Sequence, residues 1–263
     1  MTTSSSLDLP FYQTIGEELA LFETCYQQQL PLMLKGPTGC GKSRFVAYMA
    51  AKLGRSLITV ACHDDTSATD LLGRHLIKGN KTIWVDGPVT RAVRENAILY
   101  LDELVEARAD ILVVIHPLTD HRRELHVDRL NEVVKAGVQF MLVTSYNPHY
   151  QHGLKSLKPS TRQRFVSLSF DYPNAVLEQQ IIQGETSTQA STAKKLVNLA
   201  QHLRQMQGVD LAEVPSTRLL VDAAKLMAAG LPSRYACRCA IVEPLTDDPT
   251  LAQAMMDLVN ISF

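Results

Sequence analysis

Residues 36–43 have the types and spacing needed to hold the phosphates of a nucleotide. The pattern G-x-x-x-x-G-K-[ST] is matched at every fixed position by Gly36-Pro37-Thr38-Gly39-Cys40-Gly41-Lys42-Ser43. In such a loop the glycines let successive backbone N–H groups point at the anion, the lysine reaches the β- and γ-phosphates, and the last hydroxyl holds Mg²⁺. We therefore expect these residues, with the adjacent Arg44, to bind ATP and Mg²⁺.

The segments on either side of the loop support this interpretation. Leu32–Lys35 has the composition of a short buried strand, and Arg44–Leu53 has the pattern of a helix. A strand that runs through a glycine-rich loop into a helix N-terminus is the context in which this motif binds phosphate. A chance glycine-rich turn would need neither flank.

A pair of carboxylates follows another apolar run. Asp102 and Glu103 come directly after Ile98–Leu101, about 60 residues beyond the loop. A buried strand that ends in two acids delivers both to the carboxyl edge of a sheet, where Asp102 can coordinate Mg²⁺ through water beside Ser43. Glu103 is then placed to polarise the water that attacks the γ-phosphate. Taken alone, the pair could also be a helix cap.

Asn147 follows the apolar run Phe140–Thr144 and its polar continuation. If that run is the next strand of the same sheet, the Asn147 amide lies beside the phosphate loop and can orient the attacking water or sense the γ-phosphate. An isolated Asn-Pro pair would instead indicate a turn.

Three arginines are candidates for contact with the γ-phosphate. Arg162 and Arg164 precede the strand-like run Phe165–Leu168, where an arginine can reach the nucleotide of a neighbouring subunit and neutralise charge in the transition state. We expect Arg164 to have this role, with Arg162 as the alternative. Arg218 stands at a predicted helix start after Ser216, from which it could clasp the γ-phosphate and couple it to domain movement. A helix cap with a solvated arginine is the simpler interpretation of that segment.

Strand-like runs alternate with amphipathic segments in the first two thirds of the chain, which predicts a parallel sheet flanked by helices in an α/β P-loop fold. Beyond residue 173 the pattern is helical, with breaks at glycine and proline. We therefore expect an α/β domain over 1–172 and a small all-α lid domain over 173–263. The predicted strands are Leu32–Lys35, Leu57–Ala61, Ile98–Leu101, Phe140–Thr144 and Phe165–Leu168, and the predicted late helices are Ala175–Gln183, Thr192–Gln207, Ser216–Ala229, Ser233–Glu243 and Leu251–Val259.

Composition narrows the class of protein. The formal net charge is −1, which gives no global basic field for nucleic acid or an anionic membrane. No run of 18 apolar residues occurs, and Met1–Pro10 lacks the order of a signal peptide. The five cysteines fit no zinc spacing and are expected to be reduced thiols. We expect a cytoplasmic protein with no nucleic-acid or membrane partner.

With these residues in this order, the chain resembles the AAA+ ATPases of the MoxR branch. More narrowly it is similar to the CbbQ/NorQ/GvpN group, and within that group to CbbQ, the ATPase half of a Rubisco activase. The resemblance runs from about Tyr12 to the C-terminus. It is carried by Leu30–Ser43, Ala61–Asp65, Asp70–Arg74, Val114–Asp120 and Val242–Pro249.

The resemblance implies a homo-hexameric ring with ATP bound between subunits. It also implies a partner of the CbbO type that carries a von Willebrand factor A domain, and Rubisco inhibited by sugar phosphates as the client. In that family the catalytic roles correspond to Lys42, Asp102, Glu103, Asn147, Arg164 and Arg218. The usual Asp-Arg-Phe is Gln163-Arg164-Phe165 here, which leaves Arg162 as a second candidate for the arginine supplied to a neighbour.

Two insertions agree with this family. Residues 73–87 have alternating apolar residues around Gly79-Asn80, which predicts a hairpin of the kind that points to the ring pore in MoxR relatives. Residues 118–131 resemble the hairpin before the sensor strand, although their many charges are more simply a solvated face.

Other functions remain open at this point. A NorQ-type ATPase for maturation of nitric oxide reductase and a gas-vesicle ATPase of the GvpN type differ from the CbbQ type only in the client. A nucleotide-gated scaffold or DNA-binding initiator is a different class, disfavoured by the balanced charge. A small-molecule kinase is disfavoured by Asn147, Arg164 and Arg218. Guanine specificity is disfavoured because no Asn-Lys-x-Asp follows a late strand.

Overall fold

The computed structural model describes residues 9–148, 157–206 and 213–263 and divides the chain into two compact units. The larger unit holds Gly16–Gly36 and Lys42–Phe170, and the smaller unit holds Asp171–Phe263. Two short segments, Phe11–Ile15 and Pro37–Gly41, group with the smaller unit. Our domain prediction, with its boundary at residue 172, placed both segments in the first domain, whereas here they group with the helical unit. The reason is tertiary contact, since Thr38 and Gly39 lie against residues of the helical unit.

The larger unit is built on a parallel sheet of five strands in the order β2-β5-β8-β1-β9. This confirms the predicted α/β class, and the predicted bounds of the first two strands agree with the structure. The third gains Asp102 at its end, and the fourth and fifth begin one residue later than predicted. The strands are β1 (Leu32–Lys35), β2 (Leu57–Ala61), β5 (Ile98–Asp102), β8 (Met141–Tyr146) and β9 (Val166–Ser169).

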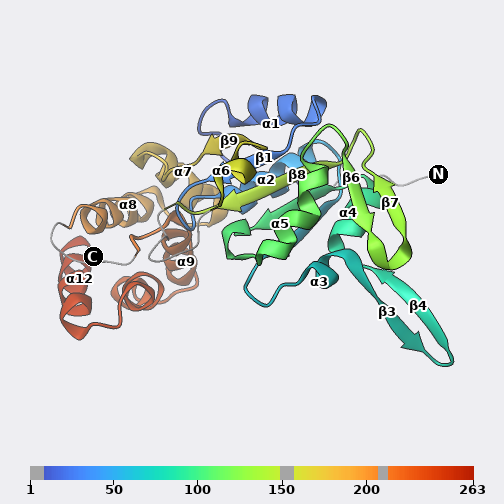
Figure 1. Ribbon diagram of the computed structural model, residues 1–263. Helices are drawn as coiled ribbons and strands as arrows, with labels where there is room; N and C mark the ends of the chain where they lie inside the picture. The colour runs from blue at the N-terminus through green and yellow to red at the C-terminus, as the bar shows by residue number, and fades with distance from the viewer. Residues whose placement is uncertain (1–8, 149–156, 207–212) are drawn as a thin grey trace, which may run out of the picture. The chain divides into compact units, whose positions relative to one another are not determined.

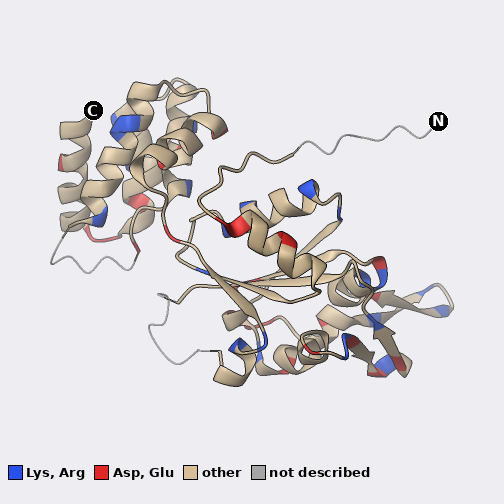
Figure 2. Ribbon diagram, turned by 90° about the horizontal axis from the view of Figure 1, so that it is seen from above, with Lys and Arg blue, Asp and Glu red and all other residues tan. Residues whose placement is uncertain are grey.

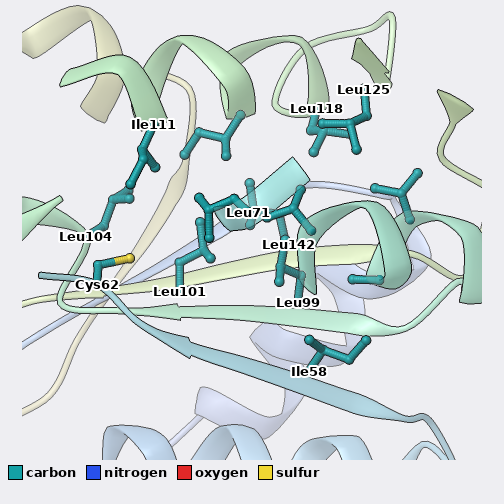
Figure 3. Close-up of a cluster of buried hydrophobic side chains, with 14 of the residues drawn as sticks. Ile58, Cys62, Leu71, Leu99, Leu101, Leu104, Ile111, Leu118, Leu125 and Leu142 are labelled. Atoms are coloured by element: carbon teal, nitrogen blue, oxygen red, sulfur yellow. The ribbon is translucent and has the colours of Figure 1, made fainter. Parts of the chain in front are cut away.

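Helices lie on both sides of the sheet (Figure 2), which explains why its inner strands are apolar on both faces. On one side Phe22 of α1 packs edge-on against Phe45 of α2, with ring centroids 5.5 Å apart. On the other side Leu99, Leu101 and Leu142 pack with side chains of the opposite helices (Figure 3). The helices are α1 (Glu18–Gln27), α2 (Lys42–Lys52), α3 (Ala68–Leu72), α4 (Pro88–Glu95), α5 (Ala109–Ile115) and α6 (Pro159–Arg162), with short 3₁₀ turns at Leu104–Glu106, His116–Leu118 and Asp128–Leu130.

Two antiparallel hairpins extend the larger unit. The first, β3 (Gly73–Lys78) with β4 (Lys81–Asp86), projects away from the sheet (Figure 1). The second pairs β6 (Glu124–Val127) with β7 (Glu132–Lys135). Its second strand lies beyond the predicted range of 118–131, which was therefore wrong at its end. Asn131 adopts a left-handed conformation, with φ 50°, and turns the chain back into β7.

Arg123 is an exception to the expectation that the charges of residues 118–131 form a solvated face, which Arg122, Asp128 and Arg129 follow. Its guanidinium is partly buried at the base of the β6–β7 hairpin and donates to three backbone carbonyls, those of Gln29 at 2.8 Å, Gly137 at 3.0 Å and Phe140 at 2.9 Å. Burial lowers the pKa of Arg123. Arg123 thus ties the hairpin to two distant segments of the unit, whereas the neighbouring Arg122 is exposed and pairs with Asp120.

The smaller unit is all-helical, and its core contains Leu196, Val197, Leu220, Ile241 and Val259. Side-chain caps explain several helix starts: Asn174 accepts from Leu177 N, Ser216 from Leu219 N and Asp248 from Thr250 N. The predicted break at Gly208 lies outside the described residues. The helices are α7 (Ala175–Glu185), α8 (Ala190–Arg204), α9 (Thr217–Ala228), α10 (Ser233–Cys237), α11 (Glu243–Leu245) and α12 (Pro249–Ser262), with a π-helical turn at Arg238–Val242.

Charge is distributed without strong segregation, since Lys and Arg alternate with Asp and Glu along both units (Figure 2). Among the described residues, no helix is both long enough and apolar enough to cross a lipid bilayer.

The contacts of Arg123 predict a difference between two adjacent arginines. Arg123→Met should lower the free energy of unfolding by about 2–3 kcal/mol, because three partly buried carbonyls lose a charged donor. Arg122→Ala should leave the urea midpoint close to that of the wild type, since its exposed ion pair contributes little. Urea titration of both variants checks this. Equal midpoints for the two variants would show that the Arg123 bonds do not stabilise the fold.

Candidate nucleotide-binding and hydrolysis site

Two glycines of the phosphate loop, one at its start and one near its end, have backbone conformations that residues with a side chain rarely adopt. Gly36 has φ +155°, and a β-carbon placed on it would lie 2.4 Å from the carbonyl oxygen of Phe170. Its N–H donates to the Tyr146 carbonyl at 3.1 Å, which fixes the loop to the end of β8. Gly41 has φ +100°. Both positions therefore require glycine, as the sequence motif implies.

Lys42 opens helix α2 and folds back over the loop, because its Nζ donates to the Gly36 carbonyl at 2.8 Å. The ammonium group is thus held on the inner side of the loop. A phosphate oxygen is a stronger acceptor for an ammonium than a neutral carbonyl is. Lys42 is positioned to exchange one for the other.

Ser43 and Asp102, which the sequence assigns to the metal, lie together although they are far apart in the chain. The Ser43 Oγ is 3.3 Å from Asp102 Oδ2 and 3.2 Å from the hydroxyl of Tyr100. The Tyr100 hydroxyl in turn donates to Asp102 Oδ1 at 2.7 Å. The donor set consists of oxygen atoms only, which is the set that Mg²⁺ prefers. The residues present therefore fit a magnesium ion.

Ser145 links the two acids and was missed by the sequence analysis. Its hydroxyl donates to Asp102 Oδ1 and accepts from the backbone N–H of Glu103 at 2.8 Å. Ser145 is fully buried on β8, and Thr144 beside it donates to the Leu101 carbonyl. A polar pair inside an otherwise apolar strand was the available signal for this role.

The electrostatics of the site follow from burial and from these two acids. Burial, and secondarily the charge of Asp102, hold the pKa of Tyr100 far above its usual value, so its hydroxyl stays a neutral donor. Burial also raises the pKa of Cys62, at the end of β2, to about 12, with contributions from the charges of Asp102 and Glu103. The carboxylates at this edge of the sheet thus disfavour further negative charge on the neighbouring side chains.

Glu103 occupies a strained position. It has φ 55° and ψ 46°, a left-handed conformation that is uncommon for a residue with a side chain, and it begins the 3₁₀ turn Leu104–Glu106. Its side chain is exposed, next to Asp102 at the carboxyl edge. Strain of this kind costs on the order of 1–3 kcal/mol and persists where the surroundings enforce it, often at active sites.

Asn147 directly follows β8, which lies between β1 and β5 in the sheet. Tyr146 is in register with Lys35, so Asn147 emerges opposite Gly36 at the start of the loop. The parallel register therefore brings Gly36, Asp102 and Asn147 to the same edge, as the sequence predicted.

Arg218 lies near the part of the loop that belongs to the helical unit. Gly39 has φ +70°, and a β-carbon placed on it would lie 2.5 Å from Ser216 Oγ and 3.3 Å from the β-carbon of Arg218. Ser216 caps α9, as the simpler interpretation of this segment held, and the side chain of Arg218 is exposed. In this unit Thr38 also accepts a hydrogen bond from the Tyr172 hydroxyl at 3.1 Å.

The two candidate arginines before β9 differ in their surroundings. Arg162, at the end of α6, is exposed. Arg164 is about one-third exposed, and one of its Nη atoms is 3.4 Å from Asp120 Oδ2. Asp120 is held mainly by Arg122, whose hydrogen bonds keep the pKa of that carboxyl well below its usual range. Burial and the Arg164 charge lower the pKa of the nearby His116.

The remaining predicted residues lie on the loop or next to it. Pro37 and Cys40 belong to the loop segment of the helical unit, with Cys40 buried, and Arg44 is on the exposed side of α2. The described structure therefore gathers Lys42, Ser43, Asp102, Glu103 and Asn147 at one sheet edge. It places Arg218 beside Gly39 in the other unit, and Arg164 against Asp120.

Comparison with known families covers nearly the whole chain. Residues 31–165 match the AAA domain of the dynein-related subfamily, and residues 178–262 match the CbbQ/NirQ/NorQ C-terminal family. Among solved structures, two mutants of RuvB from Thermotoga maritima are similar in fold. They have TM-scores of 0.54 and 0.57 at 14% sequence identity, and they cover 94% of this chain and about 70% of their own.

Several named relatives are similar over their full length. The denitrification regulatory protein NirQ of Pseudomonas aeruginosa is 56% identical over 96% of this chain and 97% of its own. NorQ of Paracoccus denitrificans is 54% identical, with 99% and 96% covered. CbbQ of Hydrogenophilus thermoluteolus is 53% identical, with 94% and 92% covered. These similarities are about equal, so the narrower likeness to CbbQ is not singled out.

The bonds of Ser145 predict a defect in metal use. Ser145→Ala should lower the maximal rate of ATP hydrolysis about tenfold and raise the Mg²⁺ concentration needed for half-maximal rate, because Asp102 and the Glu103 backbone lose a shared partner. Hydrolysis measured across a Mg²⁺ titration checks this. Ser167→Ala, on the exposed side of β9, is the control. An unchanged Mg²⁺ requirement would limit Ser145 to a packing role.

Proposed function

The chain belongs to the CbbQ/NirQ/NorQ group of AAA ATPases, and we propose that it uses Mg²⁺-dependent ATP hydrolysis to remodel a client protein. The observation that carries the site assignment is the approach of Ser43 Oγ to Asp102 Oδ2 at 3.3 Å, with Lys42 and Glu103 as their chain neighbours. This arrangement supports a bound nucleotide with its metal at the carboxyl edge of the sheet.

In the proposed reaction each residue at this edge has one task. Lys42 leaves the Gly36 carbonyl and binds the β- and γ-phosphates. Ser43, and Asp102 through water, would hold Mg²⁺, and the bound ion would supply positive charge to neutralise the phosphates. Glu103 polarises the attacking water, and Asn147 orients that water near the γ-phosphate. Catalysis is then mainly positioning and charge neutralisation.

We propose that an arginine from a neighbouring subunit completes the site and that the subunits form a hexameric ring. Arg164 is the first candidate. Among the described residues, its ion pair with Asp120 is a single long contact at a partly exposed position, so exchanging it for a phosphate costs little. Arg162, exposed two residues earlier, is the second candidate. Arg218 would bind the γ-phosphate from the helical unit of the same chain, and its position beside Gly39 supports this role.

Two clients are proposed. The sequence resemblance to CbbQ points to Rubisco inhibited by sugar phosphates, with a partner of the CbbO type that carries a von Willebrand factor A domain. The alternative from the sequence resemblance is a NorQ-type role in maturation of nitric oxide reductase. It is supported equally by 56% identity to a protein named as a denitrification regulator and 54% identity to NorQ. We also propose a cytoplasmic location without a nucleic-acid or membrane partner, which the supply of ATP and the balanced formal charge of −1 support.

Mixing two inactive variants tests the shared site. Lys42→Ala and Arg164→Ala should each lose turnover, while Arg164→Ala keeps its affinity for ATP. Co-expressed at equal levels, they should recover up to about a quarter of the wild-type rate, since that share of interfaces joins two intact halves. The measurement is steady-state ATP hydrolysis of the purified mixture.

The control mixture is Lys42→Ala with Glu103→Gln, which should stay inactive because both defects lie in the same half of the site. No recovery in the first mixture would exclude Arg164 as a residue supplied in trans. Normal turnover in Arg164→Ala, with loss in Arg162→Ala, would assign the role to Arg162.

Parallel client assays decide between the two clients. Wild-type protein with the von Willebrand factor A partner and ATP should restore carboxylation by inhibited Rubisco, and Glu103→Gln should not. In the second arm, the same two variants are compared for their ability to yield active nitric oxide reductase in cells. ATP hydrolysis without an effect in either arm would contradict both client proposals while leaving the ATPase assignment intact.

A further inference from the structure

A buried ion pair in the helical unit contains none of the residues assigned to catalysis. The carboxylate of Glu178, on α7, is fully buried and accepts two parallel hydrogen bonds from Arg204 at the end of α8, at 2.8 and 2.9 Å. The hydroxyl of Thr217 donates to the same carboxylate at 2.7 Å. The sequence analysis did not identify any of these residues.

Stability alone does not account for such a pair. Removing two charges from water costs several kcal/mol per ion, and replacing a buried pair by apolar residues of similar size is often neutral or stabilising. What a bidentate pair does provide is a fixed geometry, because the planar guanidinium and the carboxylate accept only one arrangement. The question is therefore which groups this geometry holds in place.

One group held by the pair is the start of α9. The Nε of Arg204 donates to the Pro215 carbonyl at 2.9 Å, and Glu178 binds the Thr217 side chain. The pair thus forms hydrogen bonds with the residues on both sides of Ser216. Arg218 directly follows Thr217, and Ser216 itself is packed against Gly39 of the phosphate loop.

The other group is Tyr172, at the beginning of the helical unit. The Arg204 guanidinium lies over its ring, 4.4 Å from the centroid, and the Tyr172 hydroxyl donates to the Thr38 carbonyl of the phosphate loop at 3.1 Å. Burial raises the pKa of Tyr172 to about 12, so the hydroxyl remains a donor at neutral pH. The face of the guanidinium positions the ring while its edge binds Glu178 and Pro215.

We propose that Glu178, Arg204 and Tyr172 are positioning residues that fix Arg218 and the Thr38–Gly39 segment of the phosphate loop relative to each other. This inference rests on the proposed function, because it assigns Arg218 to the γ-phosphate. Nucleotide bound to the loop is then sensed by the helical unit through this set of contacts, and the set acts on hydrolysis only through Arg218 and the loop.

The test replaces the pair without leaving a buried charge. The double variant Glu178→Leu/Arg204→Met should fold with an unfolding midpoint near that of the wild type. It should lower kcat/KM for ATP about tenfold. Arg218→Ala should have a similar effect, and adding it to the double variant should cost no more than twofold further, because both changes remove the same interaction.

A matched control is the exposed pair Arg238 and Glu243 of the same unit, joined at 2.8 Å. Arg238→Ala/Glu243→Ala should keep kcat/KM within twofold of the wild-type value. A second variant, Tyr172→Phe, removes only the hydroxyl that reaches Thr38. It should weaken binding of a fluorescent ATP analogue about fivefold with an unchanged unfolding midpoint.

The outcomes separate the inference from the proposed function. A folded double variant with wild-type kcat/KM, or losses that multiply with Arg218→Ala, would overturn the positioning role. If the double variant does not fold, Tyr172→Phe decides: weaker binding of the ATP analogue supports the inference, and unchanged binding overturns it. Absence of hydrolysis by the wild type would instead refute the proposed function.

Discussion

Parallel pairing of β1 with β8, and of β8 with β5, brings together the residues that follow these three strands. Parallel strands share a carboxyl edge, so Gly36, Asp102 and Asn147 must emerge side by side once the register is set. The register itself depends on apolar side chains that are buried on both faces of the sheet by helices. The site is thus a consequence of core packing, and its polar residues contribute little to choosing the fold.

The catalytic edge contains polar groups that the core must accommodate. Tyr100 and Ser145 lie on buried strands, and the hydroxyl of each donates a hydrogen bond to the carboxylate of Asp102. A buried hydroxyl without a partner is costly, so these groups stabilise the fold only while Asp102 remains in place. The hydrogen bonds that orient Asp102, the proposed metal ligand, are therefore the same ones that satisfy the buried hydroxyls.

The phosphate loop is divided between the two units. Gly36 and Lys42 belong to the α/β unit, while Pro37–Gly41 make their contacts with the helical unit through Tyr172 and Ser216. A segment of this kind cannot change its conformation without affecting both units. A nucleotide bound to this loop, as proposed, would contact backbone that is assigned partly to each unit.

Local sequence was sufficient to predict the phosphate loop, the order of the strands along the chain and the pair of acids after the third strand, because short-range patterns determine each of them. Gly36 and Gly41 have positive φ. A strand that ends in Asp102 and Glu103 can be predicted from the apolar residues directly before it. The local sequence could not reveal that Arg123 binds three carbonyls, that Thr38 belongs with the helical unit, or that Glu178 forms an ion pair with Arg204. Those contacts join residues far apart in the chain. From the sequence alone a charged side chain is expected to be exposed to solvent, and only tertiary packing decides that it is buried.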